Sequence, residues 1–155
     1  MVVEAGMTSS IEDTVTLTPS QENYLKTIYI KVSQDGYAKM SDIANMLSVQ
    51  KSSVNTALNI LARGGYINYT PYSQITLTEL GLDAAKRIIE KFKTMDNFFC
   101  NILKLSKEEA ATNSCRIEHI ISEELFRKIS KFFEFTEELY LNDPDYKKKL
   151  DDLLS

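Results

Sequence analysis

Three side chains in the second half of the sequence, Cys115, Glu118 and His119, have the types and spacing of metal ligands. Residues three and four positions apart share one face of an α-helix, so a helix here would bring a thiolate, a carboxylate and an imidazole together. Thiolate and imidazole ligands favour iron, cobalt, nickel or zinc over manganese. We therefore predict a divalent transition-metal site at these residues.

The same three residues allow other interpretations. Cysteine is common in protein cores, so the pattern also fits a half-buried helix face with no ligand. A thiol beside an imidazole could instead be oxidised reversibly. An enzyme is not expected, because no Gly-rich oxyanion or phosphate loop accompanies the Cys–His pair. Glu22, Asn23 and Asp96 are further oxygen donors, although lone helix residues of these types are usually solvated.

Short polar side chains in the first half of the chain have the composition of a DNA-reading surface. The second helix of a helix-turn-helix enters the major groove, where Gln and Asn pair with adenine, Thr contacts the thymine methyl group and Lys reaches phosphate or guanine. The alternative is that such residues only cap a helix. The residues predicted to read DNA are Gln50, Lys51, Ser52, Ser53, Asn55 and Thr56, with Tyr69, Tyr72 and Ser73 holding the flanking phosphates.

The charge of the chain limits how it could bind DNA. The 18 basic and 22 acidic residues give a net charge of −4, so unselective capture of nucleic acid or acidic membrane is not expected. Residues 1–80 hold five Lys or Arg and seven Asp or Glu residues. One copy of this region should bind DNA weakly, and we expect a homodimer to bind a double-stranded DNA operator by doubling the contacts.

The elements that must position the DNA-reading residues follow a recognisable order. A helix over 19–34 is predicted after a Thr-Pro-Ser-Gln capping box, and Ser41 is expected to cap a short helix. A second helix begins near Ser52 and ends at two glycines. Segments 66–69 and 74–77 alternate in polarity around turn residues, which predicts a hairpin. Helix, helix-turn-helix and hairpin make a winged helix.

The second half of the chain is predicted to be helical. An apolar stripe at helical spacing runs from Thr78 to about Leu103, followed by helices over roughly 107–111 and 114–140 and a last one opened by Asp143-Pro144. All seven phenylalanines lie at or after Phe92, which suits a dimer interface. The predicted fold is mainly α, with a flexible arm (1–17), a winged-helix DNA-binding domain (18–80) and a helical dimerisation and metal-sensing domain (81–155).

The composition fits an ordinary globular protein of 155 residues, with 43% hydrophobic and 26% charged residues. No apolar run approaches the roughly 20 residues that span a bilayer, so no membrane partner is expected. Two cysteines cannot form a disulfide framework, and the chain opens without a basic and apolar leader. We therefore expect a cytoplasmic protein.

The chain resembles the diphtheria toxin repressor and manganese transport regulator family in four stretches that occur in the family's order: SQENYLKTIY, SDIANMLSVQKSSVNTALNILARGGYI, ITLTELG and CRIEHIISEEL. The resemblance covers about residues 18–140. It implies a winged-helix DNA-binding domain followed by a helical dimerisation domain, with a divalent metal as corepressor. The length is similar to that of the short members, which lack a C-terminal domain resembling an SH3 fold.

The resemblance also implies roles for individual residues. Cys115, Glu118 and His119 match the cysteine-type, iron-responsive site, and Asn23 stands where helix one supplies a ligand. Departures from the two-metal manganese site are Phe92 and Ala111 at histidine positions and Lys26 at a carboxylate position, whereas Asp96 replaces a glutamate. The resemblance therefore implies one ion per subunit, Fe²⁺ first, with Mn²⁺, Co²⁺, Ni²⁺ or Zn²⁺ as alternatives. A metal-independent or thiol-responsive regulator with a degenerate site is the rival hypothesis.

Overall fold

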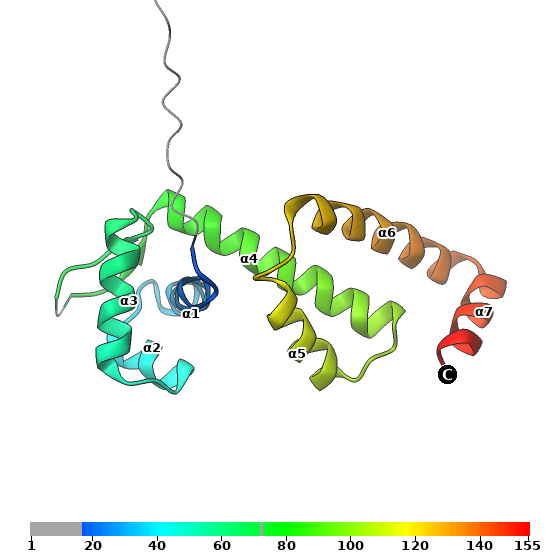
Figure 1. Ribbon diagram of the computed structural model, residues 1–155, viewed down its shortest axis with the longest axis horizontal. Coiled ribbons are helices and arrows are strands. Elements are labelled where there is room, and N and C mark those ends of the chain that lie inside the picture. Colours follow the sequence, from blue (N-terminus) through cyan, green and yellow to red (C-terminus); the bar gives the residue numbers. More distant parts are fainter. Residues whose placement is uncertain (1–16, 72) are drawn as a thin grey trace, which may run out of the picture.

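The computed structural model describes residues 17–71 and 73–155. Its N-terminal half contains three helices and a two-stranded hairpin (Figure 1). These elements are α1 (Pro19–Asp35), α2 (Met40–Leu47), α3 (Lys51–Arg63), β1 (Ile67–Asn68) and β2 (Thr76–Leu77). The predicted arm lies outside the described residues except for Leu17, which packs against the core and so belongs to the domain.

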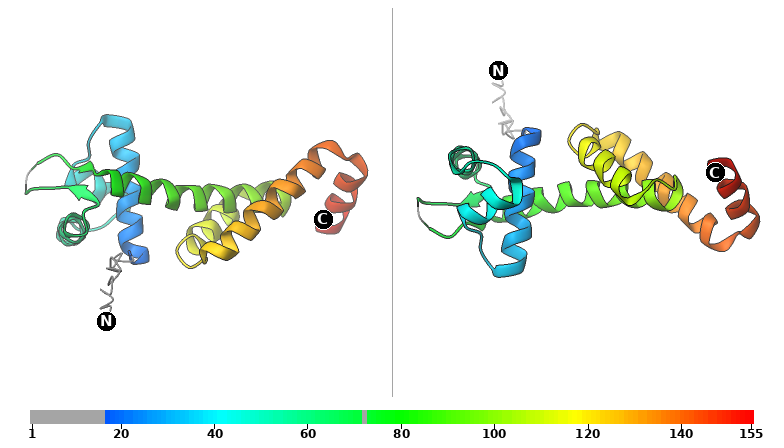
Figure 2. Two further views of the ribbon diagram at one scale, coloured as in Figure 1. Left: turned by 90° about the horizontal axis from the view of Figure 1, so that it is seen from above. Right: turned by 90° about the horizontal axis from the view of Figure 1, so that it is seen from below.

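The C-terminal half is entirely helical among the described residues. The elements are α4 (Glu79–Asn97), the π-helical turn η1 (Phe98–Ile102), α5 (Lys107–Ile117), α6 (Glu123–Asn142) and α7 (Pro144–Leu154). The long helix α4 forms a spine, with the winged-helix elements around its start and the remaining helices around its end (Figure 2). The predicted fold class, a winged helix followed by a helical domain, is confirmed.

Helix α1 forms where the sequence predicts because both of its ends are specified locally. The Gln21 amide donates to the Thr18 hydroxyl and the Thr18 amide donates to the Gln21 side chain, at 3.3 and 2.9 Å. This reciprocal pair satisfies donors that a helix start otherwise leaves free. Gly36 ends the helix in the left-handed conformation, with φ of 82°.

Helix α2 begins earlier than the sequence indicated. Lys39 is the N-cap and makes no side-chain capping bond, so the prediction that Ser41 caps this helix is wrong. The Ser41 hydroxyl turns instead to the neighbouring Asp42 carboxylate, at 3.4 Å. The backbone of Ala38 pairs with Ile75 across the base of the wing, which fixes the chain just before α2.

The first core lies where α1, α2, α3 and the start of α4 meet. Its large fully buried side chains come from the three helices and from the residue before β2: Leu25, Ile28, Ile43, Val54, Leu58, Leu61 and Ile75. The strands are shorter than predicted because the hairpin turns early. The Ser73 amide and hydroxyl both donate to the Thr70 carbonyl, at 3.0 and 2.7 Å, and only Ile67↔Leu77 and Asn68↔Thr76 pair as strand residues.

The second core joins the end of α4 to α5 and α6. Its buried members are Met95, Phe99, Ala110 and Ile121. Three predicted boundaries are corrected here. The long helix widens into a π-turn at its end, and α5 continues past Ala111 to Ile117 because Ser106 caps its start and no breaker interrupts it. The helix predicted over 114–140 begins only at Glu123, where Ser122 caps it, and continues to Asn142. None of the helices formed by the described residues is both long and apolar enough to span a membrane.

A close contact between Gly81 and the wing sets the angle at which α4 leaves the first domain. The Thr78 hydroxyl accepts from the Gly81 amide at 3.0 Å and donates to the Gly65 carbonyl at 2.6 Å. The α-carbon of Gly81 faces the Tyr66 backbone so closely that a Cβ would overlap the Tyr66 carbonyl oxygen. Only glycine allows this crossing.

We expect Gly81→Ala to lower the free energy of unfolding by about 3 kcal/mol or more, because neither backbone segment can retreat. Gly36→Ala is the matched control. Its φ of 82° is unfavourable for alanine, but nothing lies within 4 Å of the new Cβ, so it should cost about 1 kcal/mol. Urea unfolding of both variants measures the difference, and equal losses would contradict the role given to the Gly81 crossing.

Candidate metal centre and nucleic-acid interface

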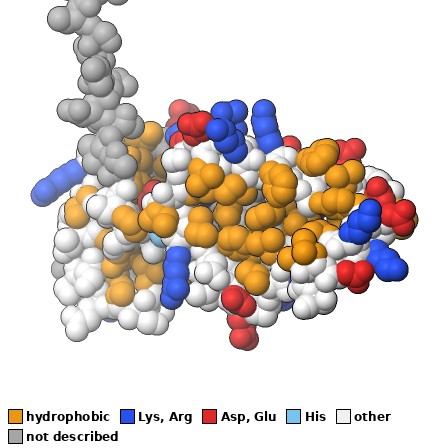
Figure 3. All heavy atoms as spheres, turned by 45° about the vertical axis from the view of Figure 1, so that its right-hand side comes forward, with side chains coloured by type: hydrophobic (Ala, Val, Ile, Leu, Met, Phe, Trp, Pro, Cys, Tyr) orange, Lys and Arg blue, Asp and Glu red, His pale blue; other side chains and the backbone are white. Residues whose placement is uncertain are grey.

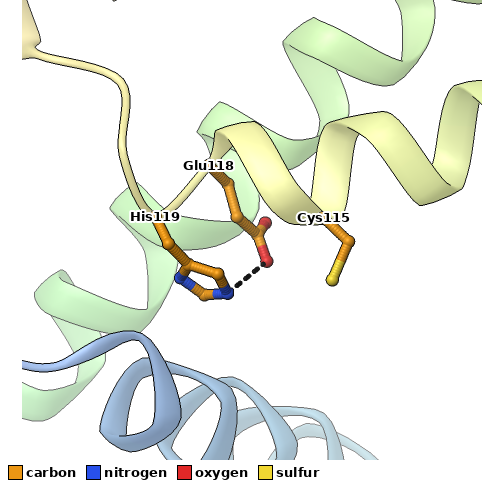
Figure 4. Close-up of side chains that lie close together, drawn as sticks. All are labelled: Cys115, Glu118 and His119. Atoms are coloured by element: carbon orange, nitrogen blue, oxygen red, sulfur yellow. Dashed lines mark ion pairs between the residues drawn. The ribbon is translucent and has the colours of Figure 1, made fainter.

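The three predicted metal ligands come together at the end of α5. One donor atom from each of Cys115, Glu118 and His119 lies within 4.8 Å of the other two. All three side chains point to the same side, toward α1 (Figure 4). The expectation that one helix carries them needs correction. Cys115 is helical, but Glu118 is the C-cap residue and His119 lies in the following turn. Glu118 keeps helical dihedral angles (φ −52°, ψ −30°), which preserves the shared face.

Two donor atoms of this cluster are buried without a hydrogen-bond partner among the described residues. They are Oε2 of Glu118 and Nε2 of His119. Nε2 lies 3.4 Å from the other oxygen of Glu118, Oε1, so the two side chains face each other within the cluster (Figure 4). Glu118 is only 3% exposed, and an unpaired buried carboxylate oxygen is unfavourable unless a cation or donor compensates it. A carboxylate, an imidazole and a thiol with unused lone pairs fit a divalent transition metal.

The histidine ring is oriented by a residue that sequence reasoning treated as solvated. Glu22 Oε2 on α1 lies 2.5 Å from Nδ1 of His119. When Nδ1–H donates to a carboxylate, the lone pair resides on Nε2, which is the form that binds a metal. The spacing along α1 could have indicated that Glu22 belongs to this cluster, because it lies one helical turn before Lys26 and shares its face of the helix.

Lys26 contacts the same cluster from α1. Its ammonium lies 2.6 Å from Oε1 of Glu118 and 4.6 Å from the centroid of the Phe92 ring. The Lys26 side chain is 19% exposed and the Glu118 side chain is fully buried. One oxygen of Glu118 is therefore paired with a protein cation, and the other is left for a ligand.

The remaining predicted ligands lie less favourably. Asn23 is half-buried, and its side chain makes no hydrogen bond with a described residue. Asp96 has a buried oxygen without a partner in the described chain, but it is not part of the ligand cluster. Both thiols, Cys100 and Cys115, are free and half-buried.

The predicted DNA-reading residues lie along the exposed start of α3. Gln50 is the N-cap residue, and Lys51, Ser52, Ser53, Asn55 and Thr56 are all exposed. Thr56 turns its hydroxyl to the Ser52 carbonyl, at 3.1 Å. A groove beside this helix is lined by residues of α3, of the wing and of the start of α2. They include Lys39, Lys51, Asn55, Tyr69, Ser73 and Gln74.

The wing contacts α3 directly. The Tyr69 hydroxyl donates to Oδ1 of Asn55 at 3.0 Å. This bond leaves the Asn55 NH₂ group free to donate to a base. The Ser73 hydroxyl is used within the turn, where it donates to the Thr70 carbonyl. Tyr72 lies outside the described residues.

Comparisons with known proteins agree with this arrangement. Residues 16–75 match the family model described as iron dependent repressor, N-terminal DNA binding domain. Residues 78–150 match the model described as iron dependent repressor, metal binding and dimerisation domain. The two models together cover almost the whole of the described chain.

Individual relatives are similar over most of the chain. An uncharacterised helix-turn-helix transcriptional regulator of Methanocaldococcus jannaschii is 35% identical over 119 residues, covering 76% of this chain and 95% of that protein. The regulator MntR of Lysinibacillus sphaericus is 33% identical over 134 residues, covering 86% and 93%. The crystal structure of IdeR from T. acidophilum superposes with a TM-score of 0.65 at 27% identity, covering 77% of this chain but only 55% of that protein. The chain thus spans about half the length of that solved regulator.

We expect the cluster to take up Co²⁺, whose bond to a thiolate absorbs visibly. Cys115→Ala and His119→Ala should each weaken Co²⁺ binding by on the order of a hundredfold, because a small ligand set cannot spare one donor. Glu22→Gln, which only orients His119, should weaken it about tenfold. Cys100→Ala is the matched control and should bind normally. A wild-type protein that takes up no Co²⁺ below about millimolar concentration would refute the metal centre.

Proposed function

The chain belongs to the iron dependent repressor family of metal-dependent transcriptional regulators, and on this premise we propose that it is a homodimeric, sequence-specific repressor controlled by one divalent metal per subunit. The family consists of regulators, in agreement with the expectation that the chain is not an enzyme. Residues 18–80 are the proposed DNA-binding domain, and residues 81–155 are the proposed dimerisation and metal-sensing domain. The proposed location is the cytoplasm, where the Cys115 thiol would stay reduced.

The pair of unpartnered atoms on Glu118 and His119 carries the metal proposal. Together with the Cys115 thiol they would hold the ion, and Asn23 on α1 is the proposed fourth ligand. A bound ion would supply positive charge that compensates Glu118 and ties α1 to the end of α5. Since α1 packs against α3 in the first core, fixing α1 would bias the placement of the reading helix on DNA.

Fe²⁺ is the proposed native ion. A site with one thiolate and one imidazole favours Fe²⁺, Co²⁺, Ni²⁺ or Zn²⁺, and one with only oxygen ligands favours Mn²⁺. The resemblance of Cys115 to the cysteine-type site supports the same choice. Mn²⁺ remains the competing candidate, because relatives in the comparison are named MntR.

A metal-independent or thiol-responsive regulator is the second candidate. One observation favours it: Lys26 and Glu118 already connect α1 with the end of α5 through a protein cation. The free Cys115 thiol near His119 would then be the sensing group. The two candidates differ in whether a chelator changes DNA affinity.

The deciding experiment measures metal content and operator affinity on the same anaerobic sample, with and without chelator. An operator is first selected from random duplex DNA. The proposal predicts that Fe²⁺ at one equivalent per subunit tightens operator binding at least about tenfold, which corresponds to the lower end of usual coupling energies. Equal affinity with and without chelator would favour the second candidate.

The DNA surface generates a separate prediction. Gln50→Ala and Asn55→Ala should each cost about 1–3 kcal/mol on the selected operator and little on random DNA, because they contact base edges. Lys51→Ala should weaken both and lower the salt slope by about one unit if it contacts phosphate. Fluorescence anisotropy over a salt series measures all three. Uniform losses on both DNAs would refute direct readout by α3.

The proposed homodimer uses the exposed apolar face of α6. Hydrophobic side chains gather over the C-terminal half of the molecule (Figure 3). Leu125, Phe132 and Phe135 on α6 are 51, 56 and 60% exposed, and the Phe132 ring packs edge-on against Phe98. An exposed group of this size on a helix is typical of a surface that another protein covers. A second copy is the proposed occupant, because this half matches a dimerisation model.

We expect Phe135→Glu to weaken the dimer at least about a hundredfold, since a symmetric interface buries the charge twice. Met46→Glu is the matched control, because Met46 is an exposed apolar residue of α2 in the DNA-binding half. Sedimentation equilibrium measures the dissociation constants. A wild-type monomer at micromolar concentration, or equal effects of both variants, would refute dimerisation through α6.

A further inference from the structure

We propose that Lys26 acts as a tethered internal cation that holds Glu118 across the contact between α1 and α5 when no metal is bound. A bound metal then has to share this carboxylate with the ammonium. Only the sharing of Glu118 between Lys26 and a metal rests on the proposed metal site. The contact between Lys26 and Glu118 itself involves residues of the chain alone.

The contact joins the two halves of the molecule. Lys26 and Glu118 are 92 positions apart in the sequence, and their atoms meet at 2.6 Å. Lys26 belongs to α1, which packs into the winged helix, and Glu118 caps α5 in the C-terminal half. Most surface ion pairs contribute little because water competes for both charges. This pair differs because the Glu118 side chain is fully buried, so losing its partner would leave an uncompensated buried charge.

One aromatic ring supports the ammonium in this position, and the carboxylate one turn before it on α1 is already engaged elsewhere. The Phe92 ring of α4 lies beneath it, at 4.6 Å from the ring centroid to Nζ. An aromatic face attracts a cation and at the same time excludes water from one side of it. On the other side, Glu22 on the same face of α1 is occupied by His119. Lys26 therefore has one buried carboxylate to neutralise, which is Glu118.

The ammonium and a metal would divide one carboxylate between them. Lys26 uses Oε1 of Glu118, which also lies 3.4 Å from His119 Nε2, while Oε2 is buried without a hydrogen-bond partner among the described residues. Two cations that bind the two oxygens of one carboxylate lie close together and repel each other. Each should therefore weaken the binding of the other, which is a reciprocal coupling. Lys26 would stabilise the metal-free protein and lower its affinity for the metal.

The first test is a mutant cycle on the full chain in the presence of chelator. Lys26→Met keeps the methylene stem over Phe92 but removes the charge, and it should lower Tm by about 5–10 °C. Glu118→Gln removes the buried charge. If Lys26 compensates the buried charge of Glu118, the Lys26→Met/Glu118→Gln double variant melts higher than Lys26→Met alone, because the unpaired carboxylate is gone. A double variant that melts at or below Lys26→Met would overturn the proposal.

Lys31→Met is the matched control for the cycle. Lys31 lies on the same helix and pairs at 2.7 Å with Asp35, one turn further along α1. The exposed fraction of Asp35 is much larger than that of Glu118, so removing this pair should change Tm by no more than about 1–2 °C. A Tm loss as large as that of Lys26→Met would mean that any charge on α1 has the same effect, and it would overturn the specific role of Lys26.

The second test measures metal affinity by Co²⁺ titration. Lys26→Met should bind Co²⁺ about tenfold more tightly than wild type, because the ion no longer shares Glu118, and Lys31→Met should bind as wild type does. Equal or weaker binding by Lys26→Met would overturn the sharing of the carboxylate. If neither protein binds Co²⁺ while the mutant cycle still shows coupling, the metal-sensing function fails and the Lys26–Glu118 contact is supported as a metal-free link.

Discussion

A carboxylate buried at the junction of two domains is the constraint on which the rest of this structure depends. Glu118 is 3% exposed, and a carboxylate so buried is unfavourable without positive or hydrogen-bonding partners. One partner, Lys26, comes from α1, and the other oxygen is left for a ligand. The position of α1 against the second domain therefore depends on how this one charge is compensated. A neutral residue at 118 would remove the Lys26 contact and leave the Glu22–His119 contact as the remaining polar link between α1 and the end of α5 among the described residues.

Helix α1 can transmit this constraint because its two faces do different work. Tyr24, Leu25 and Ile28 are buried in the winged-helix core, whereas Glu22 and Lys26 point to His119 and Glu118. Helix α1 also packs against α3, so a displacement of α1 would be transmitted to α3 through this close-packed core. The Gly81 crossing and the Thr78 hydrogen bonds hold α4 to the wing, so α4 forms a rigid connection between the two cores. The proposed coupling between the ligand cluster and α3 would run through these two helices.

The fold was largely predictable from the sequence because its signals are local. The capping box at Thr18 and Gln21, the glycines after α1 and α3, and Asp143 before Pro144 each specify a helix end. Ser41 does not cap α2, because pairing between Ala38 and Ile75, far apart in sequence, fixes the chain just before this helix. The ligand cluster was predictable from the spacing of Cys115, Glu118 and His119. The contacts made by Glu22 and Lys26 were not, since they span more than 90 positions and depend on how two domains pack.

Two of the departures from a two-metal site that the family resemblance implies, Lys26 and Phe92, contact each other in the structure. Lys26 brings a positive charge to the cluster, and an ammonium there would be unfavourable without Phe92 beneath it and Glu118 before it. A histidine at position 92 would offer a metal ligand in place of the flat ring on which the ammonium rests. Lys26 and Phe92 are therefore best understood as partners, because the ring supports the ammonium that compensates the buried Glu118 carboxylate.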